Sequence, residues 1–134
     1  MRTIRFRGKD LNNEGQWRYG SLLQYPDGSA VIVEWDDQGT ELSWDVDPAS
    51  VGQSTGLQDK EGRDIYEGDI FDWHSHPYLV EFRGGEFFAS SEACDPERYG
   101  GFSLKFIAYY DQRGKAKVIG NATDNPEMLK GGGR

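Results

Sequence analysis

The sequence predicts a mainly β protein, built from small barrel-like or sandwich-like antiparallel sheets with a short C-terminal helix. Apolar and polar residues alternate with period two along much of the chain. Turn-forming pairs that contain Gly or Pro separate these alternating segments at short intervals. Aromatic residues make up 13% of the chain and supply the large apolar side chains that a β core needs. Short strands joined by such turns are typical of small barrels and sandwiches.

The first strand is predicted at residues 3–7, "TIRFR". Successive side chains of a strand point to opposite faces, so Ile4 and Phe6 would share the apolar face. Arg5 and Arg7 would then share the polar face. This pattern indicates an amphipathic strand that lies on the core.

Two hairpins are predicted next. The segments "WRYGSLLQ" and "AVIVEW" flank Pro26 and Gly28, which suit the second position and the positive-φ position of a turn. The stretch "DDQGT" predicts a further reversal before residues 41–46, in which Leu42, Trp44 and Val46 share a face.

The middle of the chain, residues 47–70, is predicted to be a connector of fitted turns. Asp47 and Pro48 favour a turn or one helical turn, and the glycines that follow interrupt regular structure. A reversal is predicted from Asp59 to Gly62. We expect nine residues here to serve the fold: Gly52, Gly56, Leu57, Gly62, Ile65, Tyr66, Gly68, Asp69 and Ile70.

The C-terminal part carries a further hairpin signal at Gly84 and Gly85. The stretch "FSLKFIAYY" alternates apolar residues and predicts a strand, and "DQRGK" predicts a turn into the strand "AKVIGN". A helix is predicted at residues 125–130, with Asp124 or Asn125 as its cap and Pro126 in its first turn. The glycines after it predict a flexible tail at residues 131–134.

Charge is distributed unevenly along the chain. Residues 1–25 have a net charge of +3, residues 27–72 have −11, and the whole chain has −8. Duplex DNA binding depends on Lys and Arg contacts to phosphate, so this balance argues against direct nucleic-acid binding. The acidic block indicates solvated strand and loop faces, or an acidic surface that binds a basic partner. Its candidate binding residues are Asp36, Asp37, Glu41 and Asp45.

The segment "DWHSHP" offers a candidate metal site. His74 and His76 are two residues apart, so on a strand they would share a face, with Asp72 as a third ligand. The alternative is that these histidines lie exposed at a strand end. No phosphate-binding loop or nucleophile triad is present, and the acidic neighbours of Cys94 favour an inert thiol. The sequence identifies no cofactor.

Three segments carry a resemblance to a known family: "MRTIRFRGKD", "VDPASVGQSTGLQDKEGRDIYEGDIF" and "VIGNATDNPEML". Together they resemble the YopX family of phage and prophage proteins. The resemblance implies a mostly β fold, a phage or prophage origin and action inside a bacterial host. It implies no activity and no catalytic residue. The stretch from Phe82 to Tyr110 and the "HSHP" segment depart from the family pattern.

On this basis we expect one YopX-like domain over residues 1–134. Within it we expect an N-terminal β lobe at 1–55, the connector at 47–70, and an SH3-like β-barrel lobe at 65–122. The short helix and the tail would follow.

The first functional hypothesis is a non-enzymatic, homo-oligomeric accessory module that binds a host or phage macromolecule. The chain has more aromatic residues than one small core commonly needs, and some of them would pack at interfaces. The alternative is that they fill a β core in place of scarce Leu and Ile. The second is a metal-dependent hydrolase or a binder of a small nucleotide signal. The third is an acidic mimic that occupies a host nucleic-acid-binding protein. No apolar run is long enough to span a membrane, and we expect a soluble protein in the bacterial cytoplasm.

Overall fold

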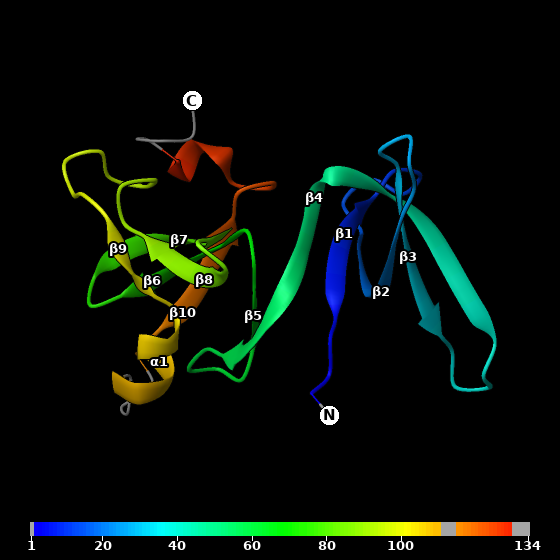
Figure 1. The fold of residues 1–134 in the computed structure, drawn as a ribbon, viewed down its shortest axis with the longest axis horizontal. Helices are drawn as coiled ribbons and strands as arrows, with labels where there is room; N and C mark the ends of the chain where they lie inside the picture. Colours follow the sequence, from blue (N-terminus) through cyan, green and yellow to red (C-terminus); the bar gives the residue numbers. More distant parts are fainter. Residues whose placement is uncertain (1, 111–114, 130–134) are drawn as a thin grey trace. The chain divides into compact units, whose positions relative to one another are not determined.

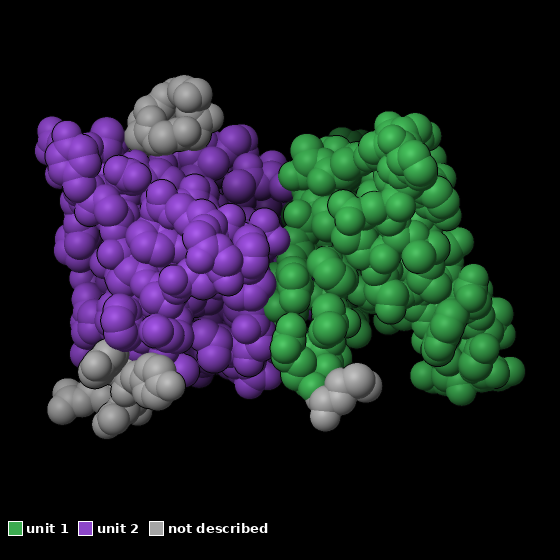
Figure 2. Space-filling model, viewed as in Figure 1, with its two compact units in different colours: residues 1–54 green, residues 55–134 purple. Residues whose placement is uncertain are grey.

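The computed structural model describes residues 2–110 and 115–129 (Figure 1). The chain divides into two compact units, residues 1–54 and residues 55–134, called unit 1 and unit 2 below (Figure 2). The described residues form two five-stranded antiparallel sheets, which confirms the prediction of a mainly β fold. The predicted turn at "DQRGK" falls mostly on residues 111–114, and the predicted tail at 131–134, so both lie outside the described residues.

Unit 1 is a ring of four strands. These are β1 (Phe6–Asp10), β2 (Trp17–Gln24), β3 (Ala30–Trp35) and the first part of β4 (Glu41–Gln58). β1 pairs with both β2 and β4, and β3 joins β2 to β4, so the sheet closes on itself. Closure removes sheet edges wherever the ladders continue. The interior holds Ala30, Ile32 and Val46, with Phe6, Leu22, Trp44 and Val51 packed against them.

The predicted hairpins around Gly28 and at residues 36–40 are confirmed by the β2–β3 and β3–β4 ladders. The first strand differs from its prediction. It begins at Phe6, and Ile4 is 54% exposed instead of lying in the core. Arg7, expected on the polar face, is only 7% exposed, and its guanidinium lies 4.6 Å from the centre of the Trp17 ring. Stacking on an aromatic face allows an arginine to be covered, which alternation of polarity does not reveal.

The prediction that residues 47–58 have little regular structure was wrong, because β4 runs through them (Figure 1). The turn-forming residues produce a bulge within the strand. The β1–β4 register shifts there, and the Ser50 hydroxyl accepts the backbone N–H of Lys9 at 2.8 Å and donates to the Asp47 carbonyl at 2.6 Å. A bulge tolerates Pro48, which has no N–H to give to the ladder.

Unit 2 contains the second sheet, in the order β10-β6-β7-β8-β9. Its strands are β6 (Asp69–Trp73), β7 (His76–Arg83), β8 (Glu86–Ser90), β9 (Gly101–Ser103) and β10 (Lys117–Asn121). The short strand β5 (Asp64–Tyr66) pairs with β4. The predicted hairpin at Gly84 and Gly85 is confirmed by the β7–β8 ladder. The core is formed by Ile65, Phe71, Tyr78, Val80, Ala89, Leu104, Ile107, Ala116 and Val118.

The strand predicted through "FSLKFIAYY" was only partly right. β9 ends at Ser103, and α1 (Lys105–Tyr110) follows. Leu104 and Ile107 are both buried, at 1% and 5% exposure, and a spacing of three residues places them on the same side of a helical turn. Phe106 is 37% exposed, so the helical spacing overrides the alternation that predicted a strand.

The helix predicted at residues 125–130 is a single 3-10 turn, η1 (Pro126–Met128). Asn125 precedes it but does not cap it with its side chain. Its Oδ1 instead accepts the backbone N–H of Asn121 at 3.1 Å. A Cβ at Gly120 would lie 2.6 Å from the same Oδ1 atom, so this asparagine requires a glycine beneath it. These contacts hold residues 120–127 in place at the end of β10.

Candidate functional site

The structure separates the proposed metal ligands. His74 lies in the β6–β7 turn, whereas His76 begins β7 and pairs with Trp73. The two imidazoles therefore do not share one strand face, which corrects the geometry on which the metal hypothesis was based. Within residues 2–110 and 115–129, no three His, Cys, Asp or Glu side chains are grouped so that they could hold a metal ion.

The β6–β7 turn carries backbone strain that can be relieved. His74 and Ser75 both have positive φ, at 54° and 67°, a combination that suits Asn and Gly. We expect the double variant His74→Asn with Ser75→Gly to raise the free energy of unfolding by about 1–2 kcal/mol. Urea denaturation followed by circular dichroism measures this change. The control Ser75→Ala keeps the strain and should give no gain, and an unchanged or lower stability of the double variant would contradict the prediction.

The nine residues expected to serve the fold lie mostly in unit 2. Ile65, Tyr66 and Ile70 are buried, and the Asp69 carboxylate, also buried, accepts the Tyr66 N–H at 2.7 Å. Gly62 and Gly68 have positive φ in the turns that flank β5, and Gly56 has positive φ within β4. Leu57 packs against the core of unit 2, and Gly52 pairs with Arg7 in unit 1. All nine lie in strands or in the turns between them.

The structural role of the buried acid Asp59 was missed. Asp59, 7% exposed, accepts the backbone N–H groups of Glu61, Arg63 and Val118 at 2.9, 2.9 and 3.0 Å. Burial alone would raise its pKa, but these three donors outweigh burial and hold the pKa below the ordinary value of 3.8. The reversal predicted from Asp59 to Gly62 indicated the two hydrogen bonds within the turn, from the N–H groups of Glu61 and Arg63. The bond to Val118 crosses 59 residues and has no local signal.

Cys94 is buried, as an inert thiol would be. Burial, together with the charge of Glu81, raises its pKa to about 11. A thiol with so high a pKa holds almost no thiolate at neutral pH and is a poor nucleophile.

The four acidic residues proposed as a binding surface divide into two pairs. Asp36 and Asp37 lie in the β3–β4 turn, where the Asp36 carboxylate accepts the backbone N–H groups of Gln38 and Thr40. Glu41 and Asp45 lie on β4 and are exposed. Across the described part of the chain, no cationic side chain pairs with either of these two carboxylates. Glu41 and Asp45 are therefore available to an external cation.

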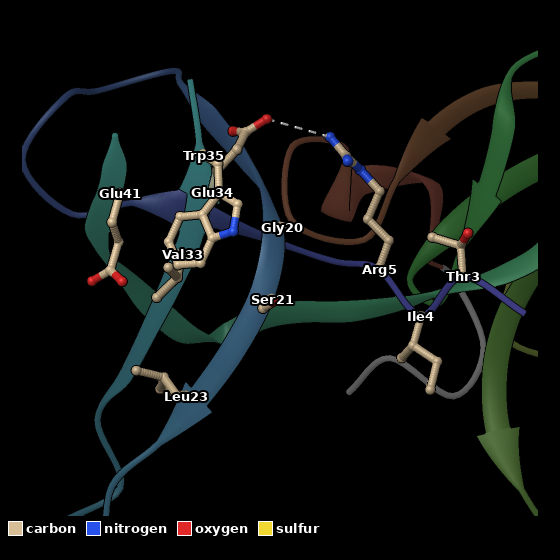
Figure 3. Close-up of a pocket in the computed structure, with 10 residues that line it drawn as sticks. All are labelled: Thr3, Ile4, Arg5, Gly20, Ser21, Leu23, Val33, Glu34, Trp35 and Glu41. Carbon is tan, nitrogen blue, oxygen red and sulfur yellow. Dashed lines mark ion pairs between the residues drawn. The ribbon is translucent and has the colours of Figure 1, made fainter. Parts of the chain in front are cut away.

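Unit 1 contains a groove of about 610 Å³, called the unit 1 groove below. It is lined by residues 3–5, Gly20, Ser21, Leu23, residues 33–35 and Glu41. Figure 3 shows the N-terminal segment with Ile4 and Arg5 on one side, and Leu23, Val33 and Trp35 of β2 and β3 on the other. Its volume is in the range of pockets that bind ligands.

The apolar lining of the groove is open to solvent. Trp35 is 60% exposed, Ile4 54% and Leu23 47%. A large exposed indole beside two exposed aliphatic side chains is the kind of surface that binding partners cover. Arg5 and Glu34 form an ion pair at one end, with Nη2 and Oε1 3.8 Å apart.

Strand register explains why the acidic residues lie beside the groove. Leu23 pairs with Val31, which pairs with Asp45, and Trp35 pairs with Glu41. Paired residues of neighbouring strands project on the same face of the sheet. The outer face of β2, β3 and β4 therefore carries a row of apolar side chains bordered by a row that contains Glu41 and Asp45.

Sequence reasoning missed this groove, although a signal was present. In "AVIVEW" the apolar residues occupy both faces of β3, since Ile32 is in the core and Val31, Val33 and Trp35 face outward. An antiparallel strand with one solvated face would alternate cleanly. Apolar residues on both faces thus indicated a second apolar surface.

No helix in the described part of the chain has the length and apolar character needed to cross a membrane. No curated protein matches the chain. Among solved structures, the chain is similar to the crystal structure of protein EF1440 from Enterococcus faecalis, with 25% sequence identity and a TM-score of 0.56, over 96% of this chain and 99% of that one. It also shares its fold with the crystal structure of protein yopX from Bacillus subtilis, with 19% identity and a TM-score of 0.54, over 94% and 98%.

The family model described as YopX protein matches residues 5–130. This range includes the second and third of the segments that carry the resemblance, and residues 5–10 of the first. It also includes most of the unit 1 groove. The chain therefore belongs to the YopX family.

Proposed function

We propose that this protein is a non-enzymatic binding module of phage or prophage origin that acts in the cytoplasm of a bacterial host. Its partner is a basic protein of the host or the phage, which it binds through the unit 1 groove. The observation that carries this proposal is the solvent-exposed apolar lining around Trp35 beside the acidic residues Glu41 and Asp45. Membership in the YopX family supports the phage origin, which the family resemblance implies.

The proposed complex is stabilised by apolar contact and by attraction between opposite charges. Covering Trp35, Leu23 and Ile4 removes apolar surface from water, which stabilises a complex by roughly 25 cal/mol per Å² before the entropy costs of association. Glu41 and Asp45 attract a cationic partner and disfavour an acidic one. Because residues 27–72 carry a net charge of −11, approach of a basic protein is favoured over long distances as well.

Homo-oligomerisation is part of the proposal. The sheet of unit 2 ends at β9 and β10, and Phe82 of β7 is 53% exposed in the same unit. Association of copies would cover such edges and aromatic side chains. We expect light scattering after size-exclusion chromatography to give a defined mass above that of one chain. A mass equal to that of one chain would refute homo-oligomerisation.

The proposal is tested by capture from a lysate of the bacterial strain that carries the gene. Tagged wild-type protein is compared with Trp35→Ser, which removes the exposed indole, and with Tyr99→Ser, which removes an exposed aromatic outside the groove. We expect a basic protein that wild type and Tyr99→Ser capture equally, and that Trp35→Ser captures at least about tenfold less, as for a central aromatic contact. Identical capture profiles for all three proteins would refute the proposed function.

A further inference from the structure

The unit 1 groove lies where the ring of strands comes apart. The β1–β2 ladder runs from the Lys9–Trp17 pair to the Phe6–Gly20 pair and ends there. β2 nevertheless continues to Gln24, paired with β3. On the other side, the Arg5 carbonyl accepts the Ser54 N–H at 2.7 Å, so the N-terminal segment follows β4.

This divergence leaves residues 21–24 of β2 as an edge. Within the described residues, their strand partners are those of β3, from the Ser21–Val33 pair to the Gln24–Ala30 pair. Backbone groups of a strand point alternately to its two sides, so every second residue here presents its N–H and C=O toward the groove. An unpaired edge of this kind is a template for another strand.

The side chains around this edge define what could bind. Leu23 and Trp35 provide apolar contact and are both exposed, while Glu41 and Asp45 provide negative charge on the same face. A strand added at the β2 edge would extend this face, with alternate side chains next to those of Ser21 and Leu23. Arg5 and Glu34 neutralise each other, so the net charge that an incoming strand meets is that of the acidic row.

From these observations we infer that the unit 1 groove receives an extended segment of the basic partner, which adds to the sheet as a strand beside residues 21–24 of β2. This inference rests on the proposed function and specifies its ligand. The segment has apolar residues at alternate positions beside Leu23, and Lys or Arg whose long side chains extend across β2 and β3 toward Glu41 and Asp45. Main-chain hydrogen bonds to the β2 edge hold it, and the side-chain pattern selects it.

The test uses a bead-bound library of blocked seven-residue peptides, composed of Val, Ile, Leu, Phe, Lys, Arg, Glu, Asp, Ser and Gly. We expect the peptides selected by the full-length protein to alternate apolar residues and to be enriched in Lys and Arg. Hydrogen exchange should slow at the amides of residues 21–24 when the best peptide binds. Selection of acidic peptides, selection without alternation, or unchanged exchange at these amides would overturn the inference.

Two further measurements separate strand addition from side-chain binding alone. N-methylation of one alternate set of the peptide's amides removes the donors to β2 and should weaken binding at least about tenfold, whereas methylation of the other set should not. Equal effects of both sets would overturn the inference. Among protein variants, Trp35→Ser and Glu41→Lys should each weaken peptide binding at least about threefold, and the matched controls Tyr99→Ser and Glu97→Lys should change it less than about twofold.

Failure of the inference can be told apart from failure of the proposed function. If no library peptide binds while capture from the lysate still depends on Trp35, the groove binds a folded surface, and only the inference is wrong. If capture does not depend on Trp35 either, the proposed function is wrong as well.

Discussion

Replacing Asp59 with Ala is expected to lower the free energy of unfolding by about 3 kcal/mol or more, because one buried donor and two turn donors lose their acceptor together. The carboxylate binds the N–H groups of Glu61 and Arg63 in the β4–β5 turn and that of Val118 in β10. The alanine side chain can replace none of these acceptors. Urea denaturation at pH 7 measures the loss.

Asp27→Ala is the matched control. This carboxylate also closes a hairpin turn, by accepting the backbone N–H of Ser29 at 2.9 Å, but it is exposed, and water can replace it. We expect a loss below about 1 kcal/mol, within the range of surface turn substitutions. Equal losses for Asp27→Ala and Asp59→Ala would contradict the view that Asp59 joins distant parts of unit 2.

The pKa of Asp59 adds a dependence on pH to the same prediction. This pKa is lower in the folded protein than the ordinary value of 3.8, so the contribution of the carboxylate is complete above that value. It is lost as the pH falls through the lowered folded pKa. The stability difference between wild type and Asp59→Asn should therefore be constant from neutral pH down to about pH 5 and should shrink below about pH 4. A difference that grows in acid would contradict the assignment.

Replacing Gly20 with Ala is expected to destabilise unit 1 by at least about 3 kcal/mol, at the upper end of the cost of overpacking. A Cβ at this position would overlap the carbonyl oxygen of Val33 and lie 3.0 Å from its carbonyl carbon. The clash is with backbone of the neighbouring strand, which cannot rotate away as a side chain can. Since Gly20 and Val33 both line the unit 1 groove, the separation of β2 and β3 there should increase.

Gly28→Ala separates this steric effect from the effect of backbone conformation. Gly28 has φ of 92°, but a Cβ there would meet nothing within 4 Å, so only the conformational cost of about 1–2 kcal/mol applies. Denaturation of both variants, together with binding of a library-selected peptide, gives the comparison. If Gly20→Ala were as stable as Gly28→Ala and bound the peptide with unchanged affinity, the backbones of β2 and β3 would move apart there at little cost in free energy. That result would contradict the prediction.

Local patterns predicted those parts of the fold whose cause is local. The turns at Gly28, at residues 36–40 and at Gly84–Gly85 each combine a turn-forming residue with flanking alternation, and the structure has hairpins at all three. At residues 47–58 the same reasoning failed. This part of β4 pairs with β1, and within that ladder the turn-forming residues produce a bulge and do not end the strand. The predicted strand through Leu104 and Ile107 failed as well. These two residues are three positions apart and are both buried in the core of unit 2, a spacing that fits a helical turn.

The candidate site shows the same limit. Charge counting located Glu41 and Asp45 as members of an acidic block, but it did not show that these carboxylates share a face with Trp35, Val31 and Leu23. Those neighbours depend on strand register. His74 and His76 show the converse, since their spacing suggests one strand face until the turn between β6 and β7 is known.

By itself the sequence determined the β fold, the position of most hairpins, the acidic character and the family, because period-two alternation, turn residues, charge and motif are properties of short segments. Only the tertiary structure decided that β1 leaves β2 after Gly20, and that Trp35, Leu23 and Ile4 remain exposed beside that opening. The physical reason is that an edge and a groove form where a ladder of hydrogen bonds between two strands stops. Where a ladder stops depends on which distant strands compete for the same backbone groups.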